Sequence, residues 1–293
     1  MITKELVQKL VQQQIPQWQH LPIEQIIPGG WDNRTFRLGN KLVVRMPSAE
    51  KYAAQIKKEF KWLPILAPLL PVAVPSPVFL GKPSERYPFT WSVYSWLEGE
   101  TVAASKNYNL CTLAESLAHF LSKLQKIDTT HGPVPGEHNF YRGGSLDVYD
   151  EQTRHAISLL KNNTDAIRAT EIWEQAITSN WQKDPVWVHG DIAAGNVLVQ
   201  NNKLSGVIDF GLLAIGDPAC DLAIAWTLFD TKSRQIFREK LELDDATWDR
   251  ARGWALWKAL IVAAKINKSN PIEMKQCWHT ITQIFDNSAI ESL

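Results

Sequence analysis

The sequence predicts an α+β protein of two lobes, a small β-rich lobe over residues 1–97 and a larger α-rich lobe over residues 98–293. Two observations carry this prediction. In the first lobe, short apolar runs are separated by turn residues, a pattern typical of strands. In the second, apolar residues recur at helical spacing over longer stretches. The length of 293 residues and the hydrophobic content of 45% are those of a globular chain, which excludes disorder and collagen-like repeats.

The first lobe is predicted to open with an amphipathic helix, MITKELVQKLVQQQ. A Gly39-Asn40 turn between the runs 35–38 and 41–46 predicts a β-hairpin. The helical spacing of the apolar residues in 49–63 predicts a helix that stops at Pro64. Further strands are predicted at 23–27, 77–81 and 91–97.

The second lobe is predicted to contain a long helix over 110–127, with Leu113, Leu117 and Leu121 on one side. The remaining predicted elements are helices at 150–161 and 165–181, strands at 186–188, 197–200 and 204–209, and helices from Pro218 onward. The lobes therefore meet near residue 97.

Charge and cysteine content exclude several classes of protein. Lys plus Arg equal Asp plus Glu at 31 each, and this neutrality argues against a general nucleic-acid binder. Three cysteines without metal-type spacing predict neither a disulfide framework nor a zinc site. The uncharged stretch 62–80 contains five prolines, too many for a membrane-spanning helix. The beginning of the chain lacks a signal peptide, so we expect a cytoplasmic protein without nucleic-acid or membrane partners.

The neutral total conceals an uneven distribution of charge. Residues 1–97 carry 12 basic and 6 acidic side chains, whereas residues 98–293 carry 19 basic and 25 acidic ones. A polarity between a positive and a negative lobe is one interpretation, and a chance split over solvated faces is the other.

The segment 186–225 contains three side chains with a suggestive spacing. Asp191 follows an apolar strand within His189-Gly190-Asp191, Asn196 comes five residues later, and Asp209 follows a second strand within Asp209-Phe210-Gly211. Phosphoryl transfer needs a carboxylate beside the accepting hydroxyl and hard oxygen ligands for Mg²⁺ on the nucleotide phosphates. Each residue alone could be a turn or capping residue, but the three spacings together favour the catalytic interpretation.

The motifs HGDIAAGN, VIDFG and GDPACDLA closely resemble the aminoglycoside phosphotransferase family, whose fold is that of the protein kinases. The resemblance extends to GGWDNRTFRLGNKLVVRMP, KKEFKWLP and WSVYSWLEGE in the first lobe, so it covers roughly residues 20–230. It implies a bilobal kinase-like fold that moves the γ-phosphate of ATP or GTP to a hydroxyl of a small molecule. Acceptors in the family include aminoglycosides, macrolides and other metabolites, so antibiotic resistance and a metabolic role both stay open.

The resemblance implies a role for each matching residue of the second lobe. Asp191 is expected to be the catalytic base, Asn196 and Asp209 to ligate Mg²⁺, and His189 to brace the catalytic loop. Asp217 and Asp221 are expected to fix the loop and the helix that follows. Before Pro218, Asp217 can also be explained simply as a helix cap.

The nucleotide-binding residues are expected in the first lobe. Its loop with Gly29, Gly30 and Asn33 lacks the GxGxxG of protein kinases, and a plain hairpin turn is the alternative interpretation. Arg45 takes the strand position where protein kinases have lysine, and Glu59 is its expected partner; an exposed strand cation is the alternative. The segment that joins the lobes supplies the expected adenine site, at Ser95, Trp96 and Leu97.

The acceptor site is predicted from acidic density. A polycationic acceptor needs acidic walls, and the densest acidic cluster of the second lobe is accompanied by a tryptophan that could line the site. The cluster and this tryptophan are Glu242, Asp244, Asp245, Trp248 and Asp249. A capped helix start explains the same carboxylates, and Trp254 and Trp257, three residues apart, fit a helix core.

Two competing functions are set against the small-molecule kinase. One is a kinase-like nucleotide-binding or regulatory protein that has lost catalysis; the intact Asp191, Asn196 and Asp209 argue against it, and the arginine at position 45 favours it. The other is a protein kinase. No long activation loop or APE segment follows Asp209-Phe210-Gly211, which disfavours a protein substrate.

Overall fold

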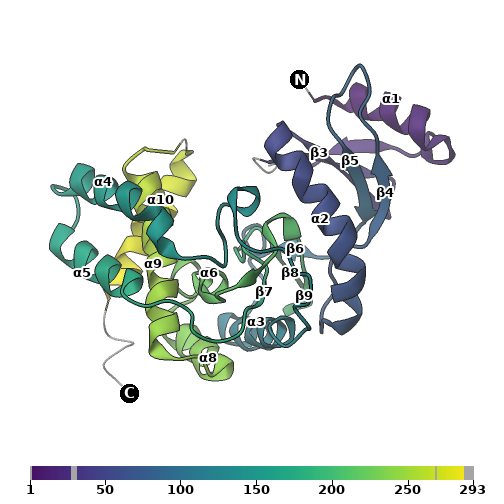
Figure 1. Ribbon diagram of the computed structural model, residues 1–293. Coiled ribbons are helices and arrows are strands. Elements are labelled where there is room, and N and C mark those ends of the chain that lie inside the picture. The colour runs from purple at the N-terminus through teal and green to yellow at the C-terminus, as the bar shows by residue number, and fades with distance from the viewer. Residues whose placement is uncertain (1, 28–31, 268, 287–293) are drawn as a thin grey trace.

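The computed structural model describes residues 2–27, 32–267 and 269–286 and has two lobes (Figure 1). The first lobe is a sheet flanked by helices. Its elements are α1 (Lys4–Gln14), β1 (Ile23–Gln25), β2 (Asn33–Leu38), β3 (Leu42–Pro47), α2 (Glu50–Leu66), β4 (Pro77–Gly81) and β5 (Trp91–Ser95). The predicted α+β fold is confirmed, and these elements follow the predicted order.

The five strands pair antiparallel in the order β1-β2-β3-β5-β4. The predicted hairpin forms: Leu38 pairs with Leu42, and Gly39 turns the chain with a φ of 60°, a left-handed conformation that favours glycine. Apolar residues of α1 pack with the inward side chains of the sheet, Phe36 and Val44 among them. This core fixes β3, the strand that carries Arg45.

The helix α2 differs from its prediction, since it continues through Pro64 and ends at Leu66. Proline removes one backbone N–H, which costs little here because Pro64 lies in the last turn and the Ala67 N–H closes that turn on the Leu63 carbonyl. The strand β5 ends at Ser95, two residues earlier than predicted, although the Trp96 N–H still donates to the Lys41 carbonyl at 2.8 Å.

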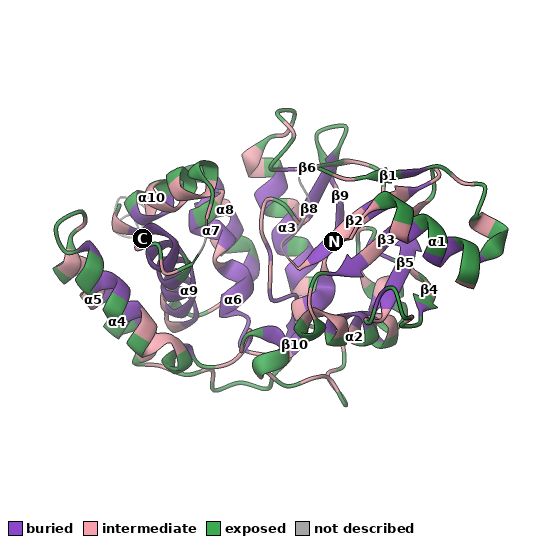
Figure 2. Cartoon of the chain, turned by 90° about the horizontal axis from the view of Figure 1, so that it is seen from above, coloured by how far each residue is buried: buried purple, intermediate pink, exposed green. Residues whose placement is uncertain are grey.

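The second lobe combines a helical body with two small sheets. Its helices are α3 (Leu110–Leu124), α4 (Asp150–Leu160), α5 (Ala166–Ile177), α6 (Ala219–Leu222), α7 (Ile224–Thr227), α8 (Thr231–Leu241), α9 (Asp245–Ala263) and α10 (Pro271–Phe285). Its strands are β6 (Glu100–Thr101), β7 (Val186–Val188), β8 (Val197–Gln200), β9 (Lys203–Val207) and β10 (Ala214–Gly216). The helix α9 lies in the interior, where Figure 2 shows it almost wholly buried between α4, α5 and α10.

The two small sheets bring the motif residues together. Strand β7 pairs with β10, and β8 pairs with β9 and β6. The chain passes between the lobes after β5, because β6 already belongs to a sheet of the second lobe. The hydrophobic core does not divide at this point: Trp62 of α2 contacts Trp187 of β7 edge to face, with ring centroids 4.8 Å apart.

The structure bears on two further expectations. Cys111, Cys220 and Cys277 are all free, as their spacing predicted. Among the described residues, no helix is both long enough and apolar enough to cross a bilayer.

Candidate active site

The catalytic loop begins where β7 ends, and its first turn requires glycine. Gly190 has a φ of 85°, and a Cβ there would lie 2.6 Å from the Leu212 carbonyl oxygen. Both the conformation and the space exclude a side chain. The loop is thereby held close to the 3₁₀ turn Phe210–Leu212, which directly follows Asp209.

His189 braces this loop from inside the core, the role that the sequence resemblance implied. The ring is fully buried, and its Nε2 lies 3.0 Å from the Ile208 carbonyl oxygen. Its Nδ1 accepts the Asp191 N–H at 3.2 Å. A carbonyl can only accept, so Nε2 must carry the proton, and the ring is a neutral imidazole that positions Asp191.

Asp221 of α6 holds the same loop by its backbone. Its two carboxylate oxygens accept the N–H groups of His189 and Gly190, each at 2.7 Å. The carboxylate is almost fully buried, and burial raises the pKa of Asp221. Because this one carboxylate accepts hydrogen bonds from two adjacent backbone amides, it fixes the orientation of the loop.

Asn196 lies against Asp191. Its Nδ2 donates to the Asp191 backbone carbonyl at 2.9 Å and to Asp191 Oδ2 at 2.8 Å. With its amide nitrogen engaged, Asn196 presents its amide oxygen as the free group. Because Oδ2 of Asp191 is occupied by Asn196, Oδ1 is the oxygen left to accept a further hydrogen bond.

Arg45 connects the first lobe to Asp209. Its guanidinium donates to both oxygens of Glu59 on α2, at 2.9 and 3.1 Å, and to Asp209 Oδ1 at 2.5 Å. Tyr94 donates its hydroxyl to Glu59 Oε2 at 2.6 Å. Burial opposes the charge, but Asp209 and Glu59 raise the pKa of Arg45 well above its ordinary value. The predicted Arg45–Glu59 partnership is therefore present.

The chemistry of these side chains fits Mg²⁺. The Asn196 amide oxygen and the Asp209 carboxylate are hard oxygen donors, and Asp209 is 40% exposed at the end of its strand. Among the described residues, no group of three or more His, Cys, Asp and Glu could hold a metal by itself. A pair of oxygen ligands that leaves the remaining positions to phosphates and water is the arrangement Mg²⁺ favours.

The loop between β1 and β2 is described only in part. Gly29 and Gly30 lie outside the described residues. Asn33 is buried, and its Oδ1 has no partner in the described part of the chain. Burial, together with the negative charges of Asp209 and Asp191, raises the pKa of Asp32. The electrostatic influence of these two carboxylates places Asp32 on the catalytic side of the loop, a relationship that the sequence did not predict.

The backbone N–H groups of the connection between the lobes differ in whether they have a partner. The Ser95 N–H donates to the Ser76 carbonyl at 2.9 Å, and the Trp96 N–H is taken by Lys41. Trp96 also lies under Arg37, whose guanidinium carbon is 4.3 Å from the ring centroid. Of the three predicted adenine-site residues, Leu97 is the one whose N–H has no backbone partner among the described residues.

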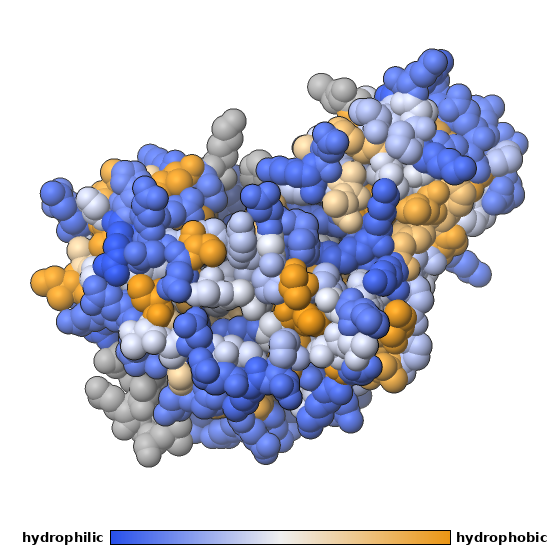
Figure 3. Space-filling model, in the orientation of Figure 1, coloured by the Kyte–Doolittle hydropathy of each residue, from blue (hydrophilic) through white to orange (hydrophobic). Residues whose placement is uncertain are grey.

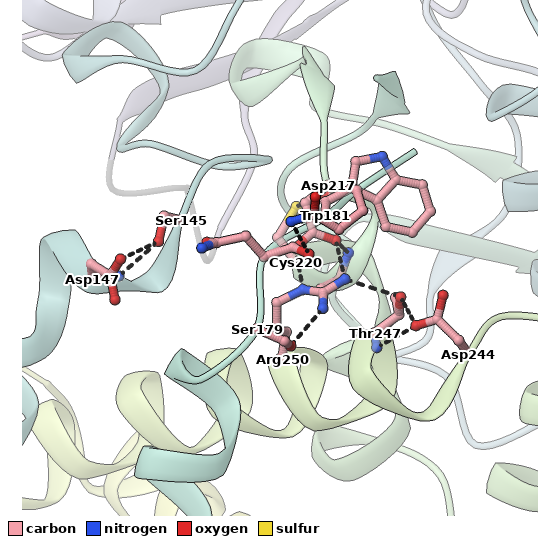
Figure 4. A network of polar contacts seen from close by, with 12 residues as sticks. Ser145, Asp147, Ser179, Trp181, Asp217, Cys220, Asp244, Thr247 and Arg250 are labelled. Atoms are coloured by element: carbon pink, nitrogen blue, oxygen red, sulfur yellow. Dashed lines mark hydrogen bonds and ion pairs between the residues drawn. The ribbon is translucent and has the colours of Figure 1, made fainter. Parts of the chain in front are cut away.

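Asp217 forms a buried ion pair with Arg250 of α9. Arg250 Nε donates to Asp217 Oδ2 at 2.6 Å, and its Nη2 donates to the Thr247 hydroxyl at 3.0 Å (Figure 4). Asp217 also accepts the Ala219 N–H at 3.0 Å, a cap-like contact with the start of α6, whose N-cap position is Pro218. The residue thus ties α6 and α9 to the strands of the site.

The predicted acidic acceptor cluster is instead part of a helix start. Asp244 is the N-cap of α9, accepts the Thr247 N–H at 2.9 Å and pairs with Lys183 at 3.2 Å. Of the other members, Asp245 pairs with Arg238, Asp249 accepts from Gln175, and Trp248 is 3% exposed in the core. Glu242 is the exposed residue that ends α8. The capped helix start, left open by the sequence, is the arrangement observed.

The position of this cluster explains the difference. The helix α9 starts beside α8 and runs to α10 (Figure 1). Lys258, fourteen residues after Asp244, is the residue of α9 on which the Asp191 charge acts. At 1.5 Å per residue the two positions are about 21 Å apart along the helix axis. The carboxylates therefore lie at the end of α9 opposite to Lys258.

Two cations near the site were missed by the sequence analysis. Arg142 lies over the rings of Trp254 and Trp257, at 4.6 and 5.1 Å from their centroids, and Lys258 follows on the same helix. A single lysine in the otherwise uncharged run WALWKALIVAA was a visible signal. Nothing local in the sequence marks Arg142, since its neighbours come from distant segments.

The fold and the site are those of bilobal, kinase-like proteins in which an Asp, an Asn and a second Asp lie between the lobes. The model of the phosphotransferase enzyme family matches residues 24–254. The chain belongs to this family.

The chain also resembles a characterised enzyme over part of its length. An aminoglycoside 3′-phosphotransferase from Escherichia coli is 26% identical over 170 residues, which cover 54% of this chain and 59% of the relative. The chain thus spans less than two thirds of that relative's length.

Solved structures share the fold over nearly the whole chain. A complex of an aminoglycoside 2″-phosphotransferase with GDP and kanamycin has a TM-score of 0.70 and 18% identity, covering 98% of this chain and 100% of the other. A macrolide 2′-phosphotransferase of type I has a TM-score of 0.62 and 18% identity, covering 97% and 98%. At these identities the likeness establishes the kinase-like fold.

Proposed function

We propose that this protein transfers the γ-phosphate of ATP or GTP to a hydroxyl group of a small molecule. The observation that carries the proposal is that Asp191, Asn196, Asp209 and Arg45 lie together. Asn196 donates a hydrogen bond to Asp191, and Arg45 of the first lobe forms an ion pair with Asp209 of the second. Family membership and relatives that phosphorylate aminoglycosides and macrolides support the same reaction.

The nucleotide would bind between residues 1–97 and 98–293, where Figure 3 shows a notch between the two lobes. The Leu97 N–H is the backbone donor available to adenine. Arg45, held by Glu59, is positioned to contact the phosphates. Asn196 and Asp209 would hold Mg²⁺, which when bound neutralises charge on the phosphate oxygens. Because Asp209 already accepts from Arg45, nucleotide binding would redistribute this ion pair.

Asp191 would act on the acceptor. Its Oδ2 is engaged by Asn196, and its Oδ1 has no hydrogen-bond partner among the described residues. The acceptor hydroxyl donates to Oδ1, its oxygen forms the new bond to the γ-phosphorus, the bond from that phosphorus to the bridging oxygen breaks, and the hydroxyl proton passes to Asp191. His189 and Asp221 hold the loop in the orientation that this contact requires.

The test is a screen of hydroxylated small molecules, read as release of nucleoside diphosphate. Its panel covers aminoglycosides, macrolides, neutral sugars and hydroxylated acids. We expect acceptor-dependent release that requires Mg²⁺. Tight nucleotide binding with no acceptor-dependent release would favour the alternative, a kinase-like binding or regulatory protein.

A further inference from the structure

One residue of α9 is exposed in the midst of a buried helix. From Thr247 to Ala263 every residue of α9 is buried except Asp249, which is half-buried, and Lys258, which is exposed. Lys258 is therefore the residue of this central helix, beyond its first turn, whose side chain reaches the surface of the lobe. The charge of Asp191 acts on its ammonium.

A second cation, Arg142, approaches Lys258 from another segment. Its loop is fastened to the strands of the site, because the Gly143 carbonyl accepts the Asp217 N–H at 2.8 Å and the Asn139 amide donates to the Leu212 carbonyl at 3.2 Å. Both cations lie over the same ring: Arg142 Cζ is 5.1 Å and Lys258 Nζ is 6.0 Å from the Trp257 centroid. The loop that carries Arg142 and the helix that carries Lys258 thus bring two positive charges together.

Neither cation has an acidic partner. No carboxylate lies within ion-pair distance of Arg142 or Lys258 among the described residues, and Arg142 Nε is buried with no hydrogen-bond partner there. The arginines 45, 154, 238 and 250, in contrast, all pair with carboxylates. Desolvation and the charge of Arg142 lower the pKa of Lys258, although the more distant charges of Asp191 and Glu273 act in the opposite direction.

Aromatic rings hold the guanidinium in place without neutralising it. Arg142 lies over Trp254 and Trp257, and Tyr149 stacks on Trp257 with centroids 3.9 Å apart. The Trp257 indole N–H donates to Gln152 at 2.7 Å, which fixes this ring. A cation stacked on fixed rings keeps its hydrogen-bond donors available for a ligand.

We propose that Arg142 and Lys258 form an anion-binding subsite for the acceptor, so that the molecule phosphorylated beside Asp191 is an alcohol that also bears a carboxylate or phosphate group. This inference rests on the proposed function, because only a phosphotransferase has an acceptor. A polycation would meet two positive charges here that form no ion pair with a described carboxylate. Asp244 and Asp245, at the other end of α9, pair with Lys183 and Arg238.

The test uses four probes with related carbon skeletons: glucose, glucosamine, gluconate and glucose 6-phosphate. Binding to the full chain, saturated with a non-hydrolysable nucleotide and Mg²⁺, is measured by calorimetry. We expect gluconate or glucose 6-phosphate to bind at least tenfold more tightly than glucose and glucosamine, with an affinity that falls as salt rises. The comparison of the two anions separates a carboxylate site from a phosphate site.

Three variants locate the effect. Lys258→Gln is the decisive one, because its exposed side chain is not needed for packing; we expect a loss of roughly 10- to 100-fold in affinity for the anion, the range of a charge-assisted hydrogen bond. Arg142→Gln should act alike, and Lys258→Glu should favour glucosamine. Lys232→Gln, an exposed lysine at the start of α8, is the matched control and should change nothing.

The outcomes separate this inference from the proposed function. Equal binding of the four probes, a preference of the native protein for glucosamine, no measurable binding of either anion, or full anion affinity in Lys258→Gln would overturn the subsite. Anion binding that requires Lys258, without nucleoside diphosphate release from hydrolysable nucleotide on any hydroxylated acid in the panel, would leave the subsite standing and contradict phosphotransfer.

Discussion

Arg45 and Asp209 form a 2.5 Å ion pair between the two lobes, although 164 residues separate them in the chain. Arg45 reaches Asp209 while it also donates to both oxygens of Glu59. A guanidinium can serve two carboxylates in this way because its donors form a planar fork, whereas an ammonium is a point charge. The arginine in the usual lysine position therefore links α2, β3 and Asp209 in one contact set.

Removal of this guanidinium should damage both stability and nucleotide binding. In Arg45→Gln the Glu59 side chain, which is 1% exposed, loses its cation, and an unpaired buried charge costs about 3–5 kcal/mol. The Tyr94 hydroxyl still donates to Glu59, so we expect the lower end of this range. Urea denaturation measures the free energy of unfolding, and fluorescence titration measures nucleotide affinity.

The double variant Arg45→Met with Glu59→Met is the control for this experiment. Replacing both members of a buried pair by apolar residues is often neutral for stability. We expect it to recover most of the free energy of unfolding but none of the nucleotide affinity. Unchanged nucleotide affinity in either variant would show that Arg45 does not contact the phosphates.

Asp191→Asn should abolish most phosphoryl transfer and leave nucleotide binding intact. The amide keeps the shape of the side chain but cannot accept the hydroxyl proton, and loss of a general base costs roughly 100- to 10,000-fold in kcat. Steady-state release of nucleoside diphosphate, with the acceptor found in the screen, measures the loss. Glu171→Gln, an exposed carboxylate on α5, is the matched control. Turnover at the native rate in Asp191→Asn would remove Asp191 from the mechanism.

Asp244→Ala tests whether the acidic cluster is structural. Loss of an N-cap costs about 1 kcal/mol of stability. We expect that loss in the free energy of unfolding, with no change in the KM for the acceptor. A rise in KM without a loss of stability would instead return Asp244 to the acceptor site.

The same variant has a defined pH dependence. Partial burial opposes the effect, but hydrogen bonds from Thr247 and the contact with Lys183 lower the pKa of Asp244 to about 2, from 3.8. A carboxylate with a lowered pKa stabilises the fold above its ordinary value and loses this contribution as pH falls toward the lowered one. The difference in stability between native protein and Asp244→Ala should therefore be constant above about pH 5 and shrink between pH 4 and pH 2.

The sequence predicted what depends on short-range pattern. The Gly39-Asn40 turn predicted the hairpin because only certain residues adopt a left-handed backbone there. The spacing of Asp191 and Asn196 predicted a contact that five residues of loop can close. The pairing of Arg45 with Glu59 followed from a strand and a helix in sequence order, and it is also present.

The acceptor side could not be predicted in the same way. An acidic cluster is a property of sequence, but whether it faces the site depends on the direction in which α9 crosses the lobe. Arg142 reaches its place only because the loop around Gly143 is bound to β10 and to Asp217. Lys258 stood out by composition, but its direction is set by the packing of α9 among other helices. Long-range packing thus determined that Arg142 and Lys258 lie against the same ring, Trp257.

Asp221→Asn tests whether a residue without substrate contact sets the geometry of catalysis. The native carboxylate accepts two backbone N–H groups, whereas an amide can accept only one and points its NH₂ at the other. The unsatisfied amide should cost about 1–3 kcal/mol of stability. Because the N–H groups belong to His189 and Gly190, the loop that carries Asp191 should shift, and misplacement by about 1 Å can lower kcat roughly 100-fold.

Asp230→Ala separates this effect from instability alone. Asp230 is the N-cap of α8, accepts the Ser233 N–H at 2.9 Å and lies outside the catalytic loop. Its loss should cost about 1 kcal/mol as well. We expect Asp230→Ala to keep the native kcat at a temperature where both variants are folded, and Asp221→Asn to lose kcat with little change in nucleotide affinity. If both variants kept the native kcat, the Asp221 carboxylate would serve folding and not the alignment of Asp191.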